Sequence, residues 1–511
     1  MNMQQQTQIV VWDALMSSGK TNKIIDYMVS ANKSSNLMMT DNDYFMYVSP
    51  YLSEAHRISA TVSEGEAQTP ILNEDGSYAY LDEPQAALQF KHPNNKNKDG
   101  SKLTGLMSLI DAKHNVVSTH TLLNSLKPEA LEQCKDYTLV IDEALVAYEG
   151  DYTLNIKTVN QYLEINILSL KEDGYTLQFN RENFGRYVTD DPNYDPTKNT
   201  ELEQFARDCD RGLLYKFNSK VIRKFDANIL TKFKKVIIMT YMFKGSMFDL
   251  LIQQAGLDVE IEYFGKRIED IAPLITINQD RKMNKVGDYG VDAKGLKHLQ
   301  KFTLTSNHFK KERDKKKDNY NETNNKLYNH LFNMWQQREK IEPERRLWTC
   351  FGDDKLAISK GKGKTNRFSS KWIAFNTRAT NDYMSADHLA FLVNVFIDSN
   401  YIKASSVDGI KLSQDHYATS ILVQWLFRSA IRNNQPIDLY IPSERMRNLL
   451  QSWLDGNVPT YHEVEELPKG IKKHRGEYTV QCKEGFNKRD LGTYDTLKEA
   501  VEAYNNYAEG K

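Results

Sequence analysis

Short apolar runs recur along the first half of the chain and predict buried strands. They are Gln8–Trp12, Phe45–Ser49, Asn115–Ser118, Thr138–Ile141 and Val236–Thr240. Between the first two runs, the segment Thr21–Val29 has apolar residues at helical spacing. Strands that alternate with helices are typical of a parallel sheet covered by helices on both faces. The pattern therefore predicts an α/β domain.

A second set of apolar runs predicts a second α/β domain. Its strands are expected at Leu347–Phe351, Trp372–Phe375 and Ile437–Ile441, with a helix over Tyr417–Arg432. The basic segment Lys310–Lys317 precedes them and is either a solvated surface or a nucleic-acid contact. A polar, tyrosine-rich stretch indicates an insertion at about 150–232. We expect domains at 1–270, 271–458 and 469–511.

Composition fits a globular protein of several domains. The 511 residues correspond to about three domains, and 40% are hydrophobic and 26% charged. Lys plus Arg (67) and Asp plus Glu (68) nearly cancel, so any attraction for nucleic acid depends on local patches.

The four cysteines lie too far apart for zinc knuckles, and a disulfide framework is not expected in so long a chain. The start of the chain lacks a signal-peptide pattern, and no apolar run reaches about 18 residues. We therefore expect a cytoplasmic protein without a membrane segment. The histidines are scattered without ligand spacing, so no resident metal site is expected from them.

The loop ALMSSGKT, residues 14–21, lies between the first strand and the first helix. Nucleotide phosphates are held by backbone N–H groups of small residues, by a lysine, and by a hydroxyl that binds Mg²⁺. The residues that supply these parts, in order, are Ser17, Ser18, Gly19, Lys20 and Thr21. We expect them to bind ATP, with Thr21 at the metal.

Paired carboxylates follow the apolar run Leu139–Ile141. Asp142, at a strand end, is suited to hold Mg²⁺, and Glu143 is suited to polarise the water that attacks the γ-phosphate. An ordinary pair of surface acids is the alternative when this segment is taken alone.

Together, the segments AxxSSGKT and VIDEA resemble the first two motifs of superfamily two helicases. Phe45–Tyr51 is similar to a DNA-contacting strand of that family. The resemblance implies a further DNA-contacting turn at Ser118, Thr119 and His120. Met239–Met242 stands where a Ser/Thr-Ala-Thr element couples hydrolysis to domain movement, with a tyrosine in place of alanine.

The resemblance continues into the second half, over roughly residues 9 to 455. Phe375–Tyr383 resembles a loop near DNA and nucleotide, which implies Arg378 as a DNA contact. Gln424–Arg432 resembles the QxxGRxxR motif, with Phe427 in place of glycine and the second arginine one residue late. It implies three catalytic residues, Gln424, Arg428 and Arg432, with the two arginines at the γ-phosphate. On one continuous helix, arginines four positions apart would share a face.

The end of the chain has a different pattern. Residues 470–508 resemble the APETALA and ethylene-response-factor DNA-binding domain, in which a three-stranded sheet enters the major groove and a helix packs behind it. Between Lys469 and Arg489 there are seven basic and two acidic residues, an excess suited to phosphate contact. The resemblance implies DNA contacts at Arg475, Lys483, Lys488 and Arg489. A solvated basic face is the alternative.

The sequence thus predicts a DNA-dependent ATPase or helicase, of the type encoded by phages. Its expected fold is α/β, with two RecA-like parallel-sheet domains around an ATP cleft and a small C-terminal α+β domain. ATP and Mg²⁺ are the expected cofactors. Single-stranded and duplex DNA are the expected partners, with RNA and phage replication proteins as further candidates. A packaging-type ATPase with a nuclease and a DNA-binding regulator that keeps the fold as a scaffold are the alternatives.

Overall fold

The computed structural model describes the greater part of the chain. The residues described are 7–38, 44–51, 57–58, 71–72, 78–79, 88–95, 101–150, 154–189, 200–217, 220–288, 302–315, 321–361, 367–368, 371–377, 382–458, 471–474, 477–484, 487–494, 499, 503–504 and 507. The chain forms two compact units, Met1–Pro459 and Thr460–Lys511.

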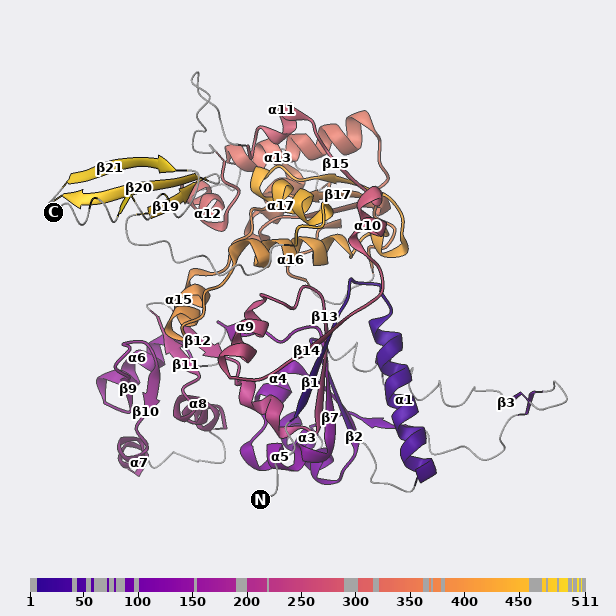
Figure 1. Cartoon of the computed structure of the whole chain (residues 1–511), viewed down its shortest axis with the longest axis vertical. Helices are drawn as coiled ribbons and strands as arrows, with labels where there is room; N and C mark the ends of the chain where they lie inside the picture. The colour runs from indigo at the N-terminus through magenta and orange to yellow at the C-terminus, as the bar shows by residue number, and fades with distance from the viewer. Residues whose placement is uncertain are drawn as a thin grey trace. The chain divides into compact units, whose positions relative to one another are not determined.

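The first domain of the larger unit is built on a seven-stranded parallel sheet (Figure 1). In spatial order its strands are β14 (Glu260–Tyr263), β1 (Gln8–Asp13), β13 (Lys235–Thr240), β7 (Tyr137–Asp142), β2 (Tyr44–Ser49), β6 (Asn115–Thr119) and β5 (Phe90–Lys91). All neighbouring pairs are parallel. The five strands predicted from apolar runs in this half are confirmed as β1, β2, β6, β7 and β13.

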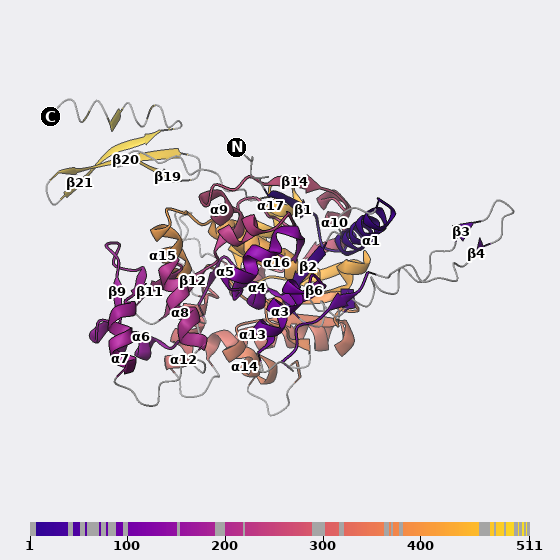
Figure 2. The same cartoon turned by 90° about the horizontal axis from the view of Figure 1, so that it is seen from below.

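Helices cover both faces of this sheet, which explains why its strands are apolar throughout rather than alternating. Along β1, Ile9 and Val11 pack on one face, and Val10 and Trp12 pack on the other. In Figures 1 and 2, α1 lies on one side of the sheet and α3, α4 and α5 lie on the opposite side. The helices of this domain are α1 (Lys20–Met38), α3 (Lys102–Asp111), α4 (His120–Asn124), α5 (Pro128–Glu132) and α9 (Met247–Gln254), with a 3-10 turn at Gln133–Asp136.

The segment between β7 and β13 packs around a small apolar core of its own, which includes Val159, Leu177 and Phe205. Its strands form a two-stranded sheet, β10-β9, and a three-stranded sheet, β11-β12-β8. The elements are β8 (Tyr148–Glu149), α6 (Ile156–Glu164), β9 (Leu168–Leu170), β10 (Leu177–Phe179), α7 (Arg181–Thr189), α8 (Thr200–Asp210), β11 (Leu214–Lys216), β12 (Val221–Lys224) and a 3-10 helix at Ala227–Lys232.

The second domain has a four-stranded parallel sheet in the order β15 (Ile275–Ile277), β18 (Ile437–Tyr440), β17 (His388–Phe391), β16 (Arg346–Thr349). Its core contains the fully buried Trp348, Trp425 and Trp453. The helices are α10 (Ile268–Ile271), α11 (Arg281–Asn284), α12 (Ser306–Lys315), α13 (Glu322–Phe332), α14 (Lys355–Lys360), α15 (Ser399–Val407), α16 (Gln414–Leu426) and α17 (Glu444–Leu454). The prediction of two RecA-like parallel-sheet domains is confirmed.

Two predictions for this domain are wrong in detail. The expected strand Trp372–Phe375 is absent from the described residues, because Trp372 forms only an isolated bridge with Trp348. The helix expected over Tyr417–Arg432 begins at Gln414 and ends at Leu426. The strands β15 and β17 were not predicted.

A segment of the second domain, residues 396–412, reaches the first domain, and we call it the arm. Its helix α15 contacts β12 and β8, and Ala404 and Ile410 are buried in the core of the first domain. At its tip, the Asp408 carboxylate accepts hydrogen bonds from three donors: the hydroxyls of Tyr148 (2.9 Å) and Tyr215 (2.7 Å) and Nζ of Lys224 (2.5 Å).

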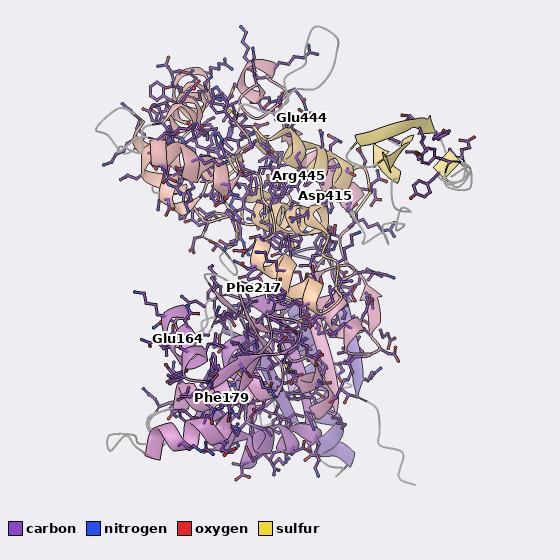
Figure 3. All side chains as sticks on the ribbon, turned by 90° about the vertical axis from the view of Figure 1, so that its left-hand side faces the viewer. Glu164, Phe179, Phe217, Asp415, Glu444 and Arg445 are labelled. Carbon is purple, nitrogen blue, oxygen red and sulfur yellow. The ribbon has the colours of Figure 1, made fainter. Side chains whose placement is uncertain are left out.

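Arg445 of α17 holds both ends of the arm. Its guanidinium donates to the carbonyl of Val395 at 2.7 Å and to Oδ1 of Asp415 at 2.7 Å. Figure 3 labels Arg445 and Asp415 on neighbouring elements of the second domain. The arm is therefore fixed at its base within the second domain and at its tip within the first.

The C-terminal unit contains a three-stranded antiparallel sheet, β19 (Ile471–His474), β20 (Glu477–Glu484) and β21 (Asn487–Tyr494). Across β20 and β21, Lys483 pairs with Lys488 and Cys482 pairs with Arg489. Arg475 lies outside the described residues. Helical backbone is described at residues 499, 503, 504 and 507.

In the described part of the chain, no helix is long and apolar enough to cross a membrane. The three cysteines whose side chains are described, Cys134, Cys209 and Cys350, are buried free thiols.

Candidate nucleotide site between the two sheets

One cavity of about 410 Å³ brings together every residue predicted for the nucleotide site. The first domain contributes Ser17, Ser18, Gly19, Lys20, Thr21, Asp142 and Glu143, and the second contributes Gln424, Arg428 and Arg432. The parallel order of the sheet explains the first set, because β1, β7 and β13 all end at the same edge.

The loop before α1 has the backbone needed to surround an anion. Ser17 and Gly19 both have left-handed backbone conformations, with φ of 62° and 81°. Because Ser17 has a side chain that disfavours this conformation, the loop holds it at some cost in strain. The helix begins directly at Lys20, and the N-terminus of a helix attracts anions. The loop start is fixed by the Ala14 amide, which donates to the Thr240 carbonyl at 3.0 Å.

Lys20 is held by its own loop. Its Nζ donates to the carbonyl of Leu15 at 3.1 Å and to that of Ala14. Burial lowers the pKa of the Lys20 ammonium to about 8, although Asp142, Asp13 and Glu143 act in the opposite direction. The lysine is therefore a desolvated cation that a polyphosphate would stabilise.

The paired carboxylates lie at the end of β7. Asp142 is the last residue of that strand and Glu143 follows it with a left-handed φ of 62°. The Glu143 amide donates to the Met239 carbonyl of β13 at 2.9 Å. His120 supports the same corner, with Nε2 3.0 Å from the Asp142 carbonyl oxygen. A non-glycine residue with positive φ at such a point is typical of a functional turn.

The two arginines do not share one helix, which corrects the expectation of a common helical face. The helix α16 ends at Leu426, Arg428 follows in a turn, and Arg432 lies in the 3-10 helix Ala430–Asn433. Both still line the cavity. Phe427, which replaces the glycine of the QxxGRxxR motif, is buried in the core of the second domain. The additional residue between the arginines is accommodated in this break.

Two residues in or beside the cavity were missed, Asp13 and Arg57. Asp13, at the end of β1, accepts the amides of Met242 and Phe243 at 2.9 Å each, and burial raises the pKa of its carboxyl. The sequence did contain a pattern that could have identified Asp13. The strand QIVVWD is apolar and ends in an acidic residue, as does the strand that ends in LVID at Asp142. Arg57 lines the cavity, as does Tyr241 of the segment Met239–Met242. The Tyr241 hydroxyl accepts the indole N–H of Trp453 at 2.7 Å, a contact between domains without a sequence signal.

The predicted DNA-contacting turn has other structural partners. Ser118 is fully buried, so its side chain is not at a surface that DNA could contact in this conformation. The Thr119 hydroxyl caps α4 by accepting the Leu122 amide, and His120 is buried beside Asp142. Arg378 lies outside the described residues.

The donor set fits a magnesium nucleotide. A cation, a hydroxyl and two carboxylates face one cavity with a helix N-terminus, and oxygen ligands of this kind suit Mg²⁺. Thr21 and Asp142 are the residues that would hold the metal, which would neutralise phosphate charge when bound.

Comparison with known proteins gives one family and several similar chains. Residues 269–454 match the family described as the YonV C-terminal Rossmann-like domain. The chain is 26% identical over 471 residues to the SPbeta prophage-derived uncharacterized protein YonV of Bacillus subtilis (strain 168), covering 88% of this chain and 98% of that protein.

Two solved structures are also similar to this chain. An apo XPD structure has 12% identity and a TM-score of 0.45, over 89% of this chain and 96% of that one. Xpd4 of S. tokodaii has 12% identity and a TM-score of 0.43, over 88% and 94%.

Proposed function

We propose that this protein is an ATP-dependent motor that acts on nucleic acid, in the form of a DNA-dependent ATPase or helicase. The observation that carries the proposal is the single cavity lined by a phosphate loop and paired carboxylates from one parallel-sheet domain and by arginines from the other. A site divided in this way makes hydrolysis depend on the relative position of the two domains.

Each residue has a role that follows from its chemistry. Lys20 and the loop amides of Ser17–Gly19 bind the β- and γ-phosphates, and Thr21 and Asp142 hold Mg²⁺. Glu143 orients and deprotonates the attacking water. Gln424 is a further group at the γ-phosphate.

Arg432 is the better candidate for stabilising charge on the γ-phosphate. The positive charge of Arg432 contributes to lowering the pKa of Lys20. Its guanidinium is therefore close enough to interact with the group that would bind the phosphates. Arg428, by contrast, is buried and donates from Nη2 to the Thr377 carbonyl at 2.9 Å, which suits a role in holding the segment in place.

The DNA and phage parts of the proposal have separate support. The basic excess between Lys469 and Arg489 suits a backbone contact with DNA, and the resemblance to the APETALA domain assigns that contact to Arg475, Lys483, Lys488 and Arg489. A similar protein is prophage-derived, which supports a phage setting. We propose domains at 1–270, 271–458 and 469–511.

ATP turnover measured with and without single-stranded DNA tests the proposal. We expect Lys20→Ala to abolish ATP binding, because the cation for the phosphates is lost. Glu143→Gln should retain binding and lose turnover by about 10²-fold or more. Arg432→Ala should retain binding and lose DNA-stimulated turnover by about 10³-fold.

Arg186→Ala is a suitable control, because Arg186 forms an exposed ion pair with Glu182 far from the cavity in sequence. It should behave as the wild type in both binding and turnover. Wild-type turnover in Glu143→Gln would refute the assignment of the site. DNA binding without any ATP turnover would favour the alternative, a DNA-binding regulator that keeps the fold as a scaffold.

A further inference from the structure

We propose that Gly265 and Lys266, in the turn that follows β14, are positioning residues that hold the phosphate loop from outside the cavity. The inference rests on the proposed ATP site and names residues that no motif includes. We call residues 264–266 the buttress turn.

The buttress turn touches the phosphate loop at Ser18. Gly265 has a φ of 82°, and a Cβ added there would lie 2.3 Å from Cβ and 2.6 Å from Oγ of Ser18. Carbon atoms in contact normally lie about 3.5–4.0 Å apart. The next amide, of Lys266, donates to Oγ of Ser18 at 3.0 Å. Only glycine allows this approach, and the Ser18 hydroxyl is used by the turn.

The buttress turn is itself tied to the two elements that carry the loop. The strand β14 pairs in parallel with β1, which leads into the loop. On the other side of the loop, Lys23 of α1 forms an ion pair with Glu262 at 2.7 Å. Its Nζ also lies 4.2 Å from the ring centroid of Phe264. The turn is thus fixed to the strand before the loop and to the helix after it.

The same turn reaches the second domain. Nζ of Lys266 donates to Oδ1 of Asn434 at 2.7 Å, and Asn434 lies two residues beyond Arg432. The buttress turn therefore contacts both Ser18 and the segment that carries Arg432, and it helps to hold both in place.

This arrangement matters for ATP binding because the backbone N–H groups of the loop must point toward the phosphates in order to bind them. A loop ordered before the ligand arrives does not lose that conformational freedom on binding. The phosphate loop contains Ser17 in a strained conformation, so an outside contact that holds its neighbour contributes directly to that order.

Gly265→Ala tests the inference, with Gly256→Ala as its matched control. Both glycines have positive φ, 82° and 70°, but nothing lies within 4 Å of a Cβ at Gly256. Both substitutions carry the same backbone penalty, and only the first meets the loop. We expect ATP Kd to rise at least about tenfold in Gly265→Ala and less than about twofold in Gly256→Ala.

Ser18→Gly provides the rescue, because it removes both the Cβ and the Oγ that the new methyl group meets. The double variant Gly265→Ala, Ser18→Gly should bind ATP within about threefold of Ser18→Gly alone. A general loss of stability at Gly265 would not be repaired at Ser18. Melting temperatures of the four variants should show similar shifts for the two glycine substitutions.

The outcomes separate the two proposals. If the wild-type protein binds no ATP, the proposed function fails, and the role of the turn fails with it. If the wild type binds ATP and Gly265→Ala binds it equally well, only the buttress turn is refuted. Failure of Ser18→Gly to restore binding would equally refute the contact with Ser18 as the cause.

Discussion

Lys20 is a cation that its own loop shields from water, and this has a consequence for pH. With a pKa of about 8, the free site loses the charge at a pH where an ordinary lysine, at about 10.4, retains it. Bound phosphates stabilise the ammonium, so binding above pH 8 requires uptake of a proton. We expect ATP Kd to be flat from pH 7 to 8 and then to rise, up to about tenfold per pH unit.

Titration of ATP binding across pH 7 to 9.5 tests this expectation. Lys20→Arg is the control wherever it still binds, because arginine remains charged throughout this range. A constant Kd in the wild-type protein up to pH 9.5 would show that the ammonium of Lys20 keeps its charge without the nucleotide.

Single residues were predictable where their role is set by near neighbours in the chain. The loop 17–21 and the pair Asp142–Glu143 carry their chemistry in local order, and all of them line the cavity. The burial of Ser118, expected as a DNA contact, was not predictable, because it depends on strands from other parts of the chain that pack beside it. Gly265 was not found at all, since the reason for glycine there is an atom 247 positions earlier in the chain.

Elements were predictable where burial on both faces makes a strand apolar throughout. The strands β1, β2, β6, β7 and β13 follow from this pattern. The pattern failed at Trp372, which forms only an isolated bridge with Trp348 of β16 and does not belong to a strand of the sheet. The pattern also missed β17. The apolar run there continues from Leu389 to Val393, beyond the end of the strand at Phe391, so it does not indicate where a strand begins or ends.

The arm offers a prediction at the level of one element. Asp408→Ala would leave two tyrosine hydroxyls and the Lys224 ammonium without their shared acceptor in a largely buried position. Removing one partner of a buried charged pair costs about 3–5 kcal/mol. We expect a clear fall in the temperature of the first thermal transition, measured by differential scanning calorimetry.

Asp415→Ala is the matched control at the base of the same arm. Its carboxylate pairs with Arg445 while more than half exposed, at 57%, and exposed pairs contribute about 0–1 kcal/mol. Equal shifts in the two variants would mean that the tip of the arm is not held by Asp408.

For the whole molecule, the C-terminal unit should add DNA affinity without taking part in hydrolysis. Every proposed catalytic group lies in the unit that ends at Pro459. Deleting residues 469–511 should leave ATP turnover without DNA nearly unchanged, weaken duplex binding, and flatten the dependence of log K on log salt, because fewer counterions are released.

Arg489→Ala should reproduce part of this change, by about one unit of slope if that side chain meets a phosphate. Binding measured from 50 to 300 mM salt gives the slopes. If the shortened protein has the same affinity and slope as the full chain, the DNA contact lies elsewhere, for example at the basic segment Lys310–Lys317.

The arm also bears on how the protein is made. Ala404 and Ile410 belong to the core of the first domain, although most of that domain precedes residue 270 in the chain. A ribosome therefore finishes the first sheet well before the residues that complete its core have been synthesised. Until residue 410 has been synthesised, the first domain exposes apolar surface to solvent beside β8 and β12. A fragment cut at residue 270 would leave that apolar surface permanently exposed to solvent.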